Sequence, residues 1–129
     1  MILLDTHVLV WAVDGSKNLS KTAASEIRRA RSQSGIAISS ISVWELAQML
    51  IRGRIHVYGN PESALEQLLE GVIVRPITPE IAILAAQFPE DYSHDPADRL
   101  IGATARAEGL TLVTRDRNIR RSPLLRTVW

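Results

Sequence analysis

Four short, largely apolar segments that alternate with longer stretches of helical spacing constrain the fold of this 129-residue chain most strongly. They lie at residues 2–4, 36–38, 72–74 and 110–113, and residues 127–129 are a candidate fifth segment. Strands of this length, separated by helices, are typical of βα units with a parallel sheet and helices on both faces. We therefore expect an α/β fold with a central, mainly parallel sheet of four to five strands.

Capping residues indicate where the helices begin. Asn60-Pro61, Thr78-Pro79 and Asp95-Pro96 each place a capping side chain before a proline, which is favoured at the first helical position. Ser20 is a further candidate cap. The expected helices cover a first stretch through Leu9, Val10 and Val13, then about 21–32, 41–52, 62–70, 79–87 and 96–108.

Charge is segregated along the chain, although 15 Lys and Arg nearly balance 14 Asp and Glu. Residues 61–98 carry eight acidic side chains and one basic one, whereas residues 99–129 carry seven basic and two acidic ones. Arginine makes up 13 of the 15 basic residues, and its planar fork suits phosphate or carboxylate partners. A solvated surface explains the same pattern, so charge alone leaves both interpretations open.

The absence of cysteine excludes disulfide scaffolds, zinc ribbons, thiol nucleophiles and iron–sulfur clusters. We find no internal repeat, linker or low-complexity tract, so residues 1–129 are expected to form a single domain. No segment has the pattern of a signal peptide or a membrane span, which leads us to expect a cytoplasmic protein without a membrane partner.

Four acidic residues fall where the predicted fold would bring them together. Asp5 directly follows the first strand, Asp116 follows the fourth, Glu45 lies in the helix after the second strand, and Asp98 lies in the first turn of the helix at Pro96. Sites in open α/β sheets lie at the carboxyl ends of the strands. Converging carboxylates repel one another and need a cation, for which Mg²⁺ or Mn²⁺ fits a set of oxygen ligands.

Each of these residues also has a purely structural interpretation. Asp5 suits a turn, Asp98 the first turn of a helix, Asp116 a helix N-cap and Glu45 a solvated helix face. Glu45 fits its alternative least well, because it stands between Trp44 and Leu46, where an unpaired carboxylate is costly. The spacing alone therefore supports a shared site without proving it.

Four ordered motifs resemble the PIN-domain family, and most closely its VapC-type toxins of bacterial toxin–antitoxin pairs. They are Leu3-Leu4-Asp5-Thr6-His7, Ser42-Val43-Trp44-Glu45-Leu46, His94-Asp95-Pro96-Ala97-Asp98-Arg99-Leu100-Ile101 and Thr114-Arg115-Asp116. The resemblance covers essentially the whole chain. It implies a PIN-like three-layer α/β/α sandwich and a Mg²⁺-dependent endoribonuclease, in which Mn²⁺ is a possible substitute and a metal-activated water attacks the RNA phosphodiester.

Matched motif by motif, the resemblance places the acidic quartet on Asp5, Glu45, Asp98 and Asp116. It implies that Asp5 and Asp98 bind the metal directly, that Glu45 holds a bound water or a second ion, and that Asp116 completes the shell. Thr114 is expected to support that shell. Asp95 remains either a ligand or, as its place before Pro96 favours, a helix N-cap.

Further residues beside the acidic motifs have weaker assignments. Arg99, Arg115 and Arg117 are candidates for contacts to substrate phosphate. His7 and His94 flank proposed ligands, but a metal site needs no histidine base. The three tryptophans are expected in the core or at an interface.

The resemblance also implies partners: an RNA substrate, a cognate VapB-type antitoxin and a second copy of the chain in a homodimer, within a higher-order toxin–antitoxin complex. One alternative is a nucleic-acid-binding or partner-binding module without a toxin role. A phosphatase of the haloacid-dehalogenase type or a phosphoacceptor receiver is disfavoured. The phosphatase normally has a second Asp two residues after its nucleophilic Asp, where this chain has His7. Both classes normally use a lysine near the phosphate, and the only lysines here are Lys17 and Lys21.

Overall fold

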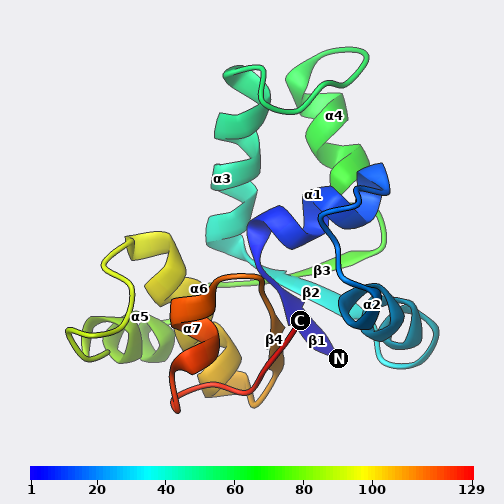
Figure 1. Cartoon of the computed structure of the whole chain (residues 1–129). Helices are drawn as coiled ribbons and strands as arrows, with labels where there is room; N and C mark the ends of the chain where they lie inside the picture. The colour runs from blue at the N-terminus through cyan, green and yellow to red at the C-terminus, as the bar shows by residue number, and fades with distance from the viewer.

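Strands and helices alternate along the chain as the apolar segments predict. The computed structural model describes all residues, 1–129. The strands are β1 (Ile2–Leu4), β2 (Ile36–Ser39), β3 (Val72–Arg75), β4 (Thr111–Val113) and β5 (Thr127–Val128). The helices are α1 (Thr6–Asp14), α2 (Lys21–Gln33), α3 (Ser40–Ile51), α4 (Pro61–Leu68), α5 (Pro79–Ala86), α6 (Pro96–Glu108) and α7 (Arg117–Arg121) (Figure 1).

The five strands form one sheet in the order β3-β2-β1-β4-β5, and every neighbouring pair is parallel. The expected four to five strands are therefore confirmed. The chain first builds outward from β1 to β2 and β3, then crosses to β4 on the other side of β1. The strand order thus reverses between β1 and β4, which is where open α/β sheets place their sites.

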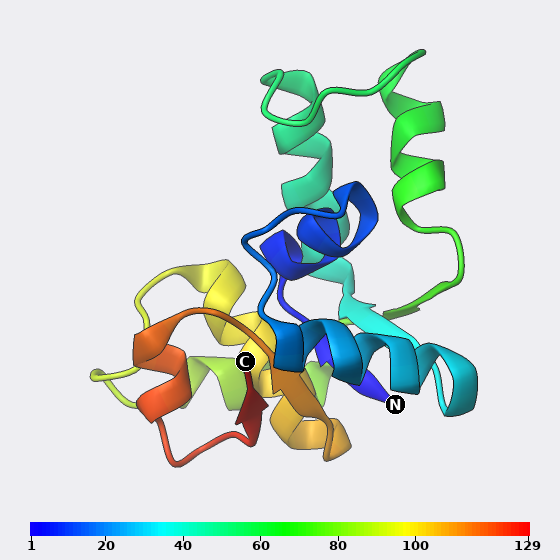
Figure 2. The same cartoon turned by 45° about the vertical axis from the view of Figure 1, so that its right-hand side comes forward.

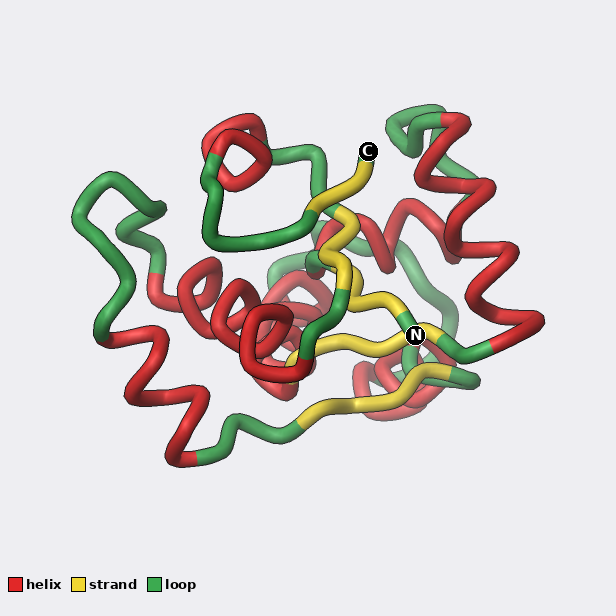
Figure 3. The backbone as a smooth tube through the Cα atoms, turned by 90° about the horizontal axis from the view of Figure 1, so that it is seen from below, coloured by secondary structure: helices red, strands yellow, loops and turns green.

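Alternating side chains of the strands divide the core into two halves. Ile2 and Leu4 pack with residues of α1, α2, α3 and α4, whereas Leu3 between them packs with residues of α5, α6 and α7. Figure 3 shows the yellow strands running between the red helices of the two layers. Because successive side chains of a strand point to opposite faces, this burial pattern produces the expected three-layer sandwich.

Two features go beyond the sequence prediction. Helix α7 was indicated only by the N-cap interpretation of Asp116 and was not among the expected helices, because a helix of five residues is too short for apolar periodicity to reveal. Helices α3 and α4 lie side by side and extend away from the sheet in both Figure 1 and Figure 2. No helix combines the length and the apolar character needed to cross a bilayer.

Candidate active site

The sheet brings the predicted acidic residues into one hollow of about 280 Å³ at the carboxyl ends of β1 and β4. All four members of the predicted quartet line it, although they come from four different parts of the chain. The lining consists of Asp5, His7, Val8, Trp11, Glu45, Asp95, Asp98, Arg115 and Asp116. Five carboxylates against one arginine make this hollow strongly acidic.

Asp5 stands at the junction of β1 and α1. Its backbone N–H donates to the carbonyl of Val113 on β4 at 3.0 Å, and its Oδ1 accepts from the N–H of Thr6 at 2.9 Å as the cap of α1. Its Oδ2 accepts a hydrogen bond from the Thr114 hydroxyl at 2.8 Å. The predicted supporting role of Thr114 therefore has a geometric basis, since Thr114 holds one oxygen of the central carboxylate in place.

Two further hydroxyls orient two other, half-buried carboxylates. Thr6 donates to Oε1 of Glu45, and Ser42 Oγ lies 2.8 Å from the same threonine hydroxyl. Ser93 donates to Oδ2 of Asp98 at 2.6 Å from the loop before α6. Each of these carboxylates is thus held by a neutral donor, and none of them forms an ion pair with a basic side chain of the protein.

Asp95 and Asp116 both cap helices, as their structural interpretations predicted. Asp95 accepts from the N–H of Ala97 at 2.8 Å and of Asp98 at 3.3 Å, both through Oδ1. Asp116 accepts from the N–H of Asn118 at 2.8 Å and of Ile119 at 3.1 Å, again through Oδ1. Because only one oxygen of each is used, both residues cap a helix and line the acidic hollow at once.

Burial and mutual repulsion disfavour the charged forms of three site carboxylates. Burial raises the pKa of Asp98 to about 6, and the negative charges of Asp5, Asp95 and Asp116 add to this effect. The hydrogen bond from Ser93 favours the charged form and lowers the pKa in part. Burial also raises the pKa of Asp5, opposed by the Thr114 hydroxyl, and that of Glu45, opposed by Thr6. Clustered carboxylates with raised pKa values are typical of functional sites.

The donor set fits a hard divalent cation, because five of the lining residues offer carboxylate oxygens, against a single imidazole from His7 and no thiolate. No three Asp, Glu or His side chains, however, stand close enough to hold an ion between them. Mg²⁺ commonly uses only one or two carboxylates and fills its remaining positions with water and substrate oxygens. The arrangement therefore matches an open magnesium site better than a closed protein cage.

The structure places Arg99, which was predicted to contact substrate phosphate or support the metal shell, outside the lining of the acidic hollow. Its guanidinium turns away from the hollow and donates to the carbonyl oxygens of Phe88 at 2.8 Å and Pro89 at 3.0 Å, with Ala85 at 3.5 Å. The Phe88 and Pro89 carbonyls follow the end of α5 (Pro79–Ala86), where helical hydrogen bonds no longer continue, so arginine on the adjacent α6 donates to them. Arg99 thus anchors the loop that carries Ser93.

Arg115 does line the hollow, as predicted, and its guanidinium lies 5.7 Å from the centroid of the Trp11 ring. His7 also lines the hollow, whereas His94 does not. Trp11 and Trp129 are half-buried against the core, in keeping with the prediction, while the Trp44 side chain is 57% exposed. Arg115 remains the best candidate in the hollow for a contact to phosphate.

Sequence reasoning missed the roles of Thr6, Ser93 and Trp11. Thr6 directly follows Asp5, and its position at the start of a helix next to a proposed ligand was a usable signal. Ser93 had none, because it lies in a loop whose path depends on the Arg99 contacts. Trp11 was assigned only to packing, although its ring also forms a wall of the hollow.

Comparison with known proteins agrees with this geometry. The family model described as "PIN domain" matches residues 2–123. The chain belongs to the PIN-domain family. It is 41% identical over an alignment of 130 residues to "Ribonuclease VapC22" of Mycobacterium tuberculosis (strain ATCC 25618 / H37Rv), covering 99% of this chain and 98% of that protein. The resemblance to VapC-type members of the PIN-domain family is therefore confirmed.

Solved structures share the fold of this chain. VapBC2 from Rickettsia felis, bound to a DNA fragment from its promoter, matches with a TM-score of 0.75 at 22% identity, covering 99% of this chain and 98% of that one. VapC20 from M. tuberculosis, described as a Sarcin-Ricin loop cleaving toxin, matches with a TM-score of 0.64 at 17% identity and 92% coverage of both chains. At such identities the similarity confirms the fold alone.

Proposed function

We propose that this protein is a VapC-type toxin, a Mg²⁺-dependent endoribonuclease that hydrolyses RNA phosphodiester bonds and is inhibited by a cognate VapB-type antitoxin. The observation that carries the proposal is the convergence of Asp5, Glu45, Asp98 and Asp116 on one hollow at the point where the strand order reverses. The 41% identity to a protein named as a ribonuclease supports the activity.

Asp5 and Asp98 are the residues we assign as direct ligands of Mg²⁺, with Mn²⁺ as a substitute. A bound ion supplies a lowered pKa for a coordinated water and positive charge against the phosphate in the transition state. Glu45 and Asp116 orient water around the ion, and Thr6, Ser93 and Thr114 hold the carboxylates in their positions. Arg115 contributes a positive charge at the rim of the hollow.

An antitoxin partner is supported by the kind of structure that this fold matches, since the neighbours include VapBC complexes such as that from Salmonella typhimurium, with a TM-score of 0.72 and 22% identity. An antitoxin arginine inserted among the uncompensated carboxylates would form strong charge-assisted hydrogen bonds and compete with the metal. The homodimer and the cytoplasmic location belong to the same proposal.

Cleavage of a mixed RNA substrate by purified protein tests the proposal. We expect cleavage in Mg²⁺ or Mn²⁺, none in EDTA, and a loss of at least about 100-fold in Asp5→Asn and in Asp98→Asn. Asp91→Asn is the matched control, because Asp91 is an exposed carboxylate outside the acidic hollow. Addition of the antitoxin should abolish cleavage by the wild type.

Calorimetric titration with Mn²⁺ separates the proposal from a binding module without activity. Binding of Mn²⁺ that disappears in Asp5→Asn and persists in Asp91→Asn supports a metal-dependent enzyme. A folded wild-type protein that binds no divalent ion and cuts no RNA would rule the enzyme out and leave the binding module as the function.

A further inference from the structure

Helix α7 and strand β5 border a second charged feature, an open groove of about 420 Å³ outside the acidic hollow. Its basic side chains are Arg117, Arg120 and Arg121, and its other walls are Thr127, Val128 and Trp129. All three arginines are exposed. The two ion pairs of the molecule, Arg29–Glu26 and Arg75–Glu108, lie elsewhere, so these three charges are not neutralised by any acidic side chain.

The groove adjoins the acidic hollow through two tryptophans in contact. The ring of Trp129, which lines the groove, packs edge-on against Trp11 with centroids 5.9 Å apart, and Trp11 lines the hollow. Asp116 connects the two from the other side, because it lines the hollow and caps the helix that carries the three arginines. A strand lying across the tryptophan pair would therefore reach both features.

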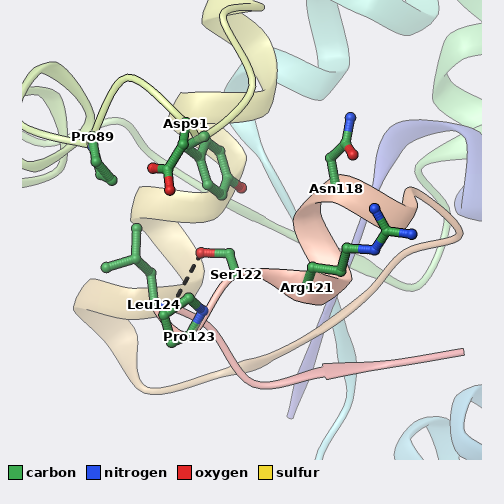
Figure 4. A pocket seen from close by; sticks show the side chains of 8 residues that line it. Pro89, Asp91, Asn118, Arg121, Ser122, Pro123 and Leu124 are labelled. Carbon is green, nitrogen blue, oxygen red and sulfur yellow. Dashed lines mark hydrogen bonds between the residues drawn. The ribbon is translucent and has the colours of Figure 1, made fainter.

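The opposite side of α7 is less suited to an anionic strand. A hollow of about 250 Å³ lies there. Figure 4 shows that Asn118 and Arg121 line it from α7, while Pro89 and Asp91 line it from the loop before α6. The carboxylate of Asp91 opposes negative ligands on that side, whereas the groove beside β5 contains no acidic side chain. Charge thus favours the β5 side.

We propose that the α7–β5 groove binds the phosphates of single-stranded RNA next to the phosphate that lies in the acidic hollow. The inference rests on the proposed ribonuclease function and names the surface that holds the substrate. Unpaired arginines beside a path lined with aromatic rings are the combination that proteins use for single strands, since arginine binds phosphate bidentately and the rings accept bases. An RNA nuclease also needs contacts beyond the scissile phosphate to hold a flexible strand.

Fluorescence anisotropy of a labelled single-stranded RNA of about ten nucleotides tests the groove. All variants are made in the full chain with Asp5→Asn, which prevents cleavage. The test variant is Arg117→Gln/Arg120→Gln/Arg121→Gln. The control is Lys21→Gln/Arg28→Gln/Arg31→Gln, which removes the same charge from exposed positions of α2. Thermal unfolding checks that both variants fold.

We expect the α7 variant to bind RNA roughly 10-fold or more weakly in 0.1 M KCl, and to reduce the slope of log affinity against log salt by about 2, or about 0.7 for each lost phosphate contact. The α2 control should change both values much less. Replacing the same three arginines with lysine should restore the slope, because the charges remain. Equal losses in the α7 variant and the α2 control would overturn the inference.

The same substitutions in the cleaving protein separate the groove from the proposed function. An increase in KM with unchanged kcat in the α7 variant supports both the RNA-binding groove and the proposed ribonuclease function. If the wild type cuts no RNA with any metal but the α7 variant still loses RNA affinity and slope, the ribonuclease fails and the groove stands. If the α7 variant loses antitoxin binding and keeps its RNA affinity, the groove belongs to the protein partner and the inference is wrong.

Discussion

Two fully buried threonine hydroxyls do much of the positioning in the acidic hollow. Thr6 and Thr114 have exposed fractions of 1% and 0%, and each donates to a different carboxylate, Glu45 and Asp5. A buried hydroxyl is rigidly placed and costly to leave without a partner. These threonines therefore hold the carboxylates in position even though the carboxylates repel one another.

Replacing Thr114 with valine keeps the shape of the side chain and removes its hydroxyl. The hydroxyl donates to Asp5 and accepts from the N–H of Asp116 at 3.1 Å, so both partners lose a bond. We expect a loss of about 1–3 kcal/mol in the free energy of unfolding and about 10- to 100-fold in kcat/KM. Urea unfolding and RNA cleavage measure these effects, and Thr114→Ser should retain most of both. Equal cleavage by the valine and serine variants would contradict the positioning role.

Asp98 should make the metal-free protein less stable at neutral pH. Its folded-state pKa of about 6 lies above the unfolded value near 3.8. Between these values the folded state holds a proton that the unfolded state has lost, so the free energy of unfolding falls as pH rises through this window. In EDTA at pH 7, Asp98→Asn should therefore stabilise the protein by about 1–2 kcal/mol, allowing for screening of a partly exposed group.

Thermal unfolding at several pH values in EDTA checks this effect. The gain from Asp98→Asn should be present at pH 7 and largely lost at about pH 3, below both pKa values, where the wild-type carboxyl is mostly protonated in both states. Asp91→Asn, outside the acidic hollow, should show no such difference. A stabilisation that does not change between these pH values would mean that the charge of Asp98 is not its cause.

At the scale of elements, the contact between α6 and the end of α5 places Asp98. Arg99 of α6 binds the carbonyls of Phe88 and Pro89, and the loop that begins there returns Ser93 to Asp98. One arginine therefore links the helix that carries a site carboxylate to the loop that orients it. Arg99, which was predicted to contact substrate phosphate, contacts backbone carbonyls in this structure.

Replacing Arg99 with methionine should loosen this loop without removing a site carboxylate. We expect Mn²⁺ affinity and kcat/KM to fall by about 10-fold, because the Ser93 donor is no longer held against Asp98. Arg99→Lys should recover only part of the loss, since an ammonium group cannot span both carbonyls as the guanidinium does. Calorimetry measures the affinity. An Mn²⁺ affinity equal to that of the wild type would show that the Arg99 contacts to the Phe88 and Pro89 carbonyls contribute to stability alone.

Gly102 allows α6 to approach the aromatic residues of the same loop closely. A Cβ atom at this position would lie 2.4 Å from Tyr92 Oη and 3.1 Å from Phe88 Cε2. Gly102→Ala should therefore destabilise the protein by about 1–3 kcal/mol, although alanine is the better helix former. Tyr92→Phe removes the closest atom, so adding it to Gly102→Ala should recover part of the loss in urea unfolding. If the losses in free energy of unfolding from Gly102→Ala and Tyr92→Phe simply add in the double variant, the predicted clash between Cβ and Tyr92 Oη would be excluded.

At the scale of the whole molecule, metal binding should stabilise the fold. The acidic hollow collects carboxylates from the first strand, the third helix and the segments on both sides of β4, so an ion bound there connects both halves of the chain. With metal at ten times its dissociation constant we expect about 1.4 kcal/mol of added stability. Thermal unfolding with and without Mn²⁺ should show the gain in the wild type and in Asp91→Asn. The same gain in Asp5→Asn would place the ion elsewhere.

Much of this architecture is predictable from local sequence. The apolar runs at residues 2–4 and 36–38 gave strands because short β-branched and aliphatic stretches favour buried strands. Asn60, Thr78 and Asp95 cap helices as predicted, because capping depends only on adjacent backbone N–H groups. The four acidic positions of the quartet were identifiable for a similar reason, since each is attached to the end or start of an element.

Contacts between distant segments decided the rest. The order of the strands, which puts β4 beside β1, sets Thr114 against Asp5, and no local pattern encodes that pairing. Arg99 is next to Asp98 in sequence but turns toward the end of another helix, because the carbonyls of Phe88 and Pro89 after α5 are within its reach. By itself, the sequence determined the elements, their caps and the chemistry of the site. Only the tertiary structure decided which hydroxyl holds which carboxylate and which arginines remain free, because those outcomes depend on packing between residues far apart in the chain.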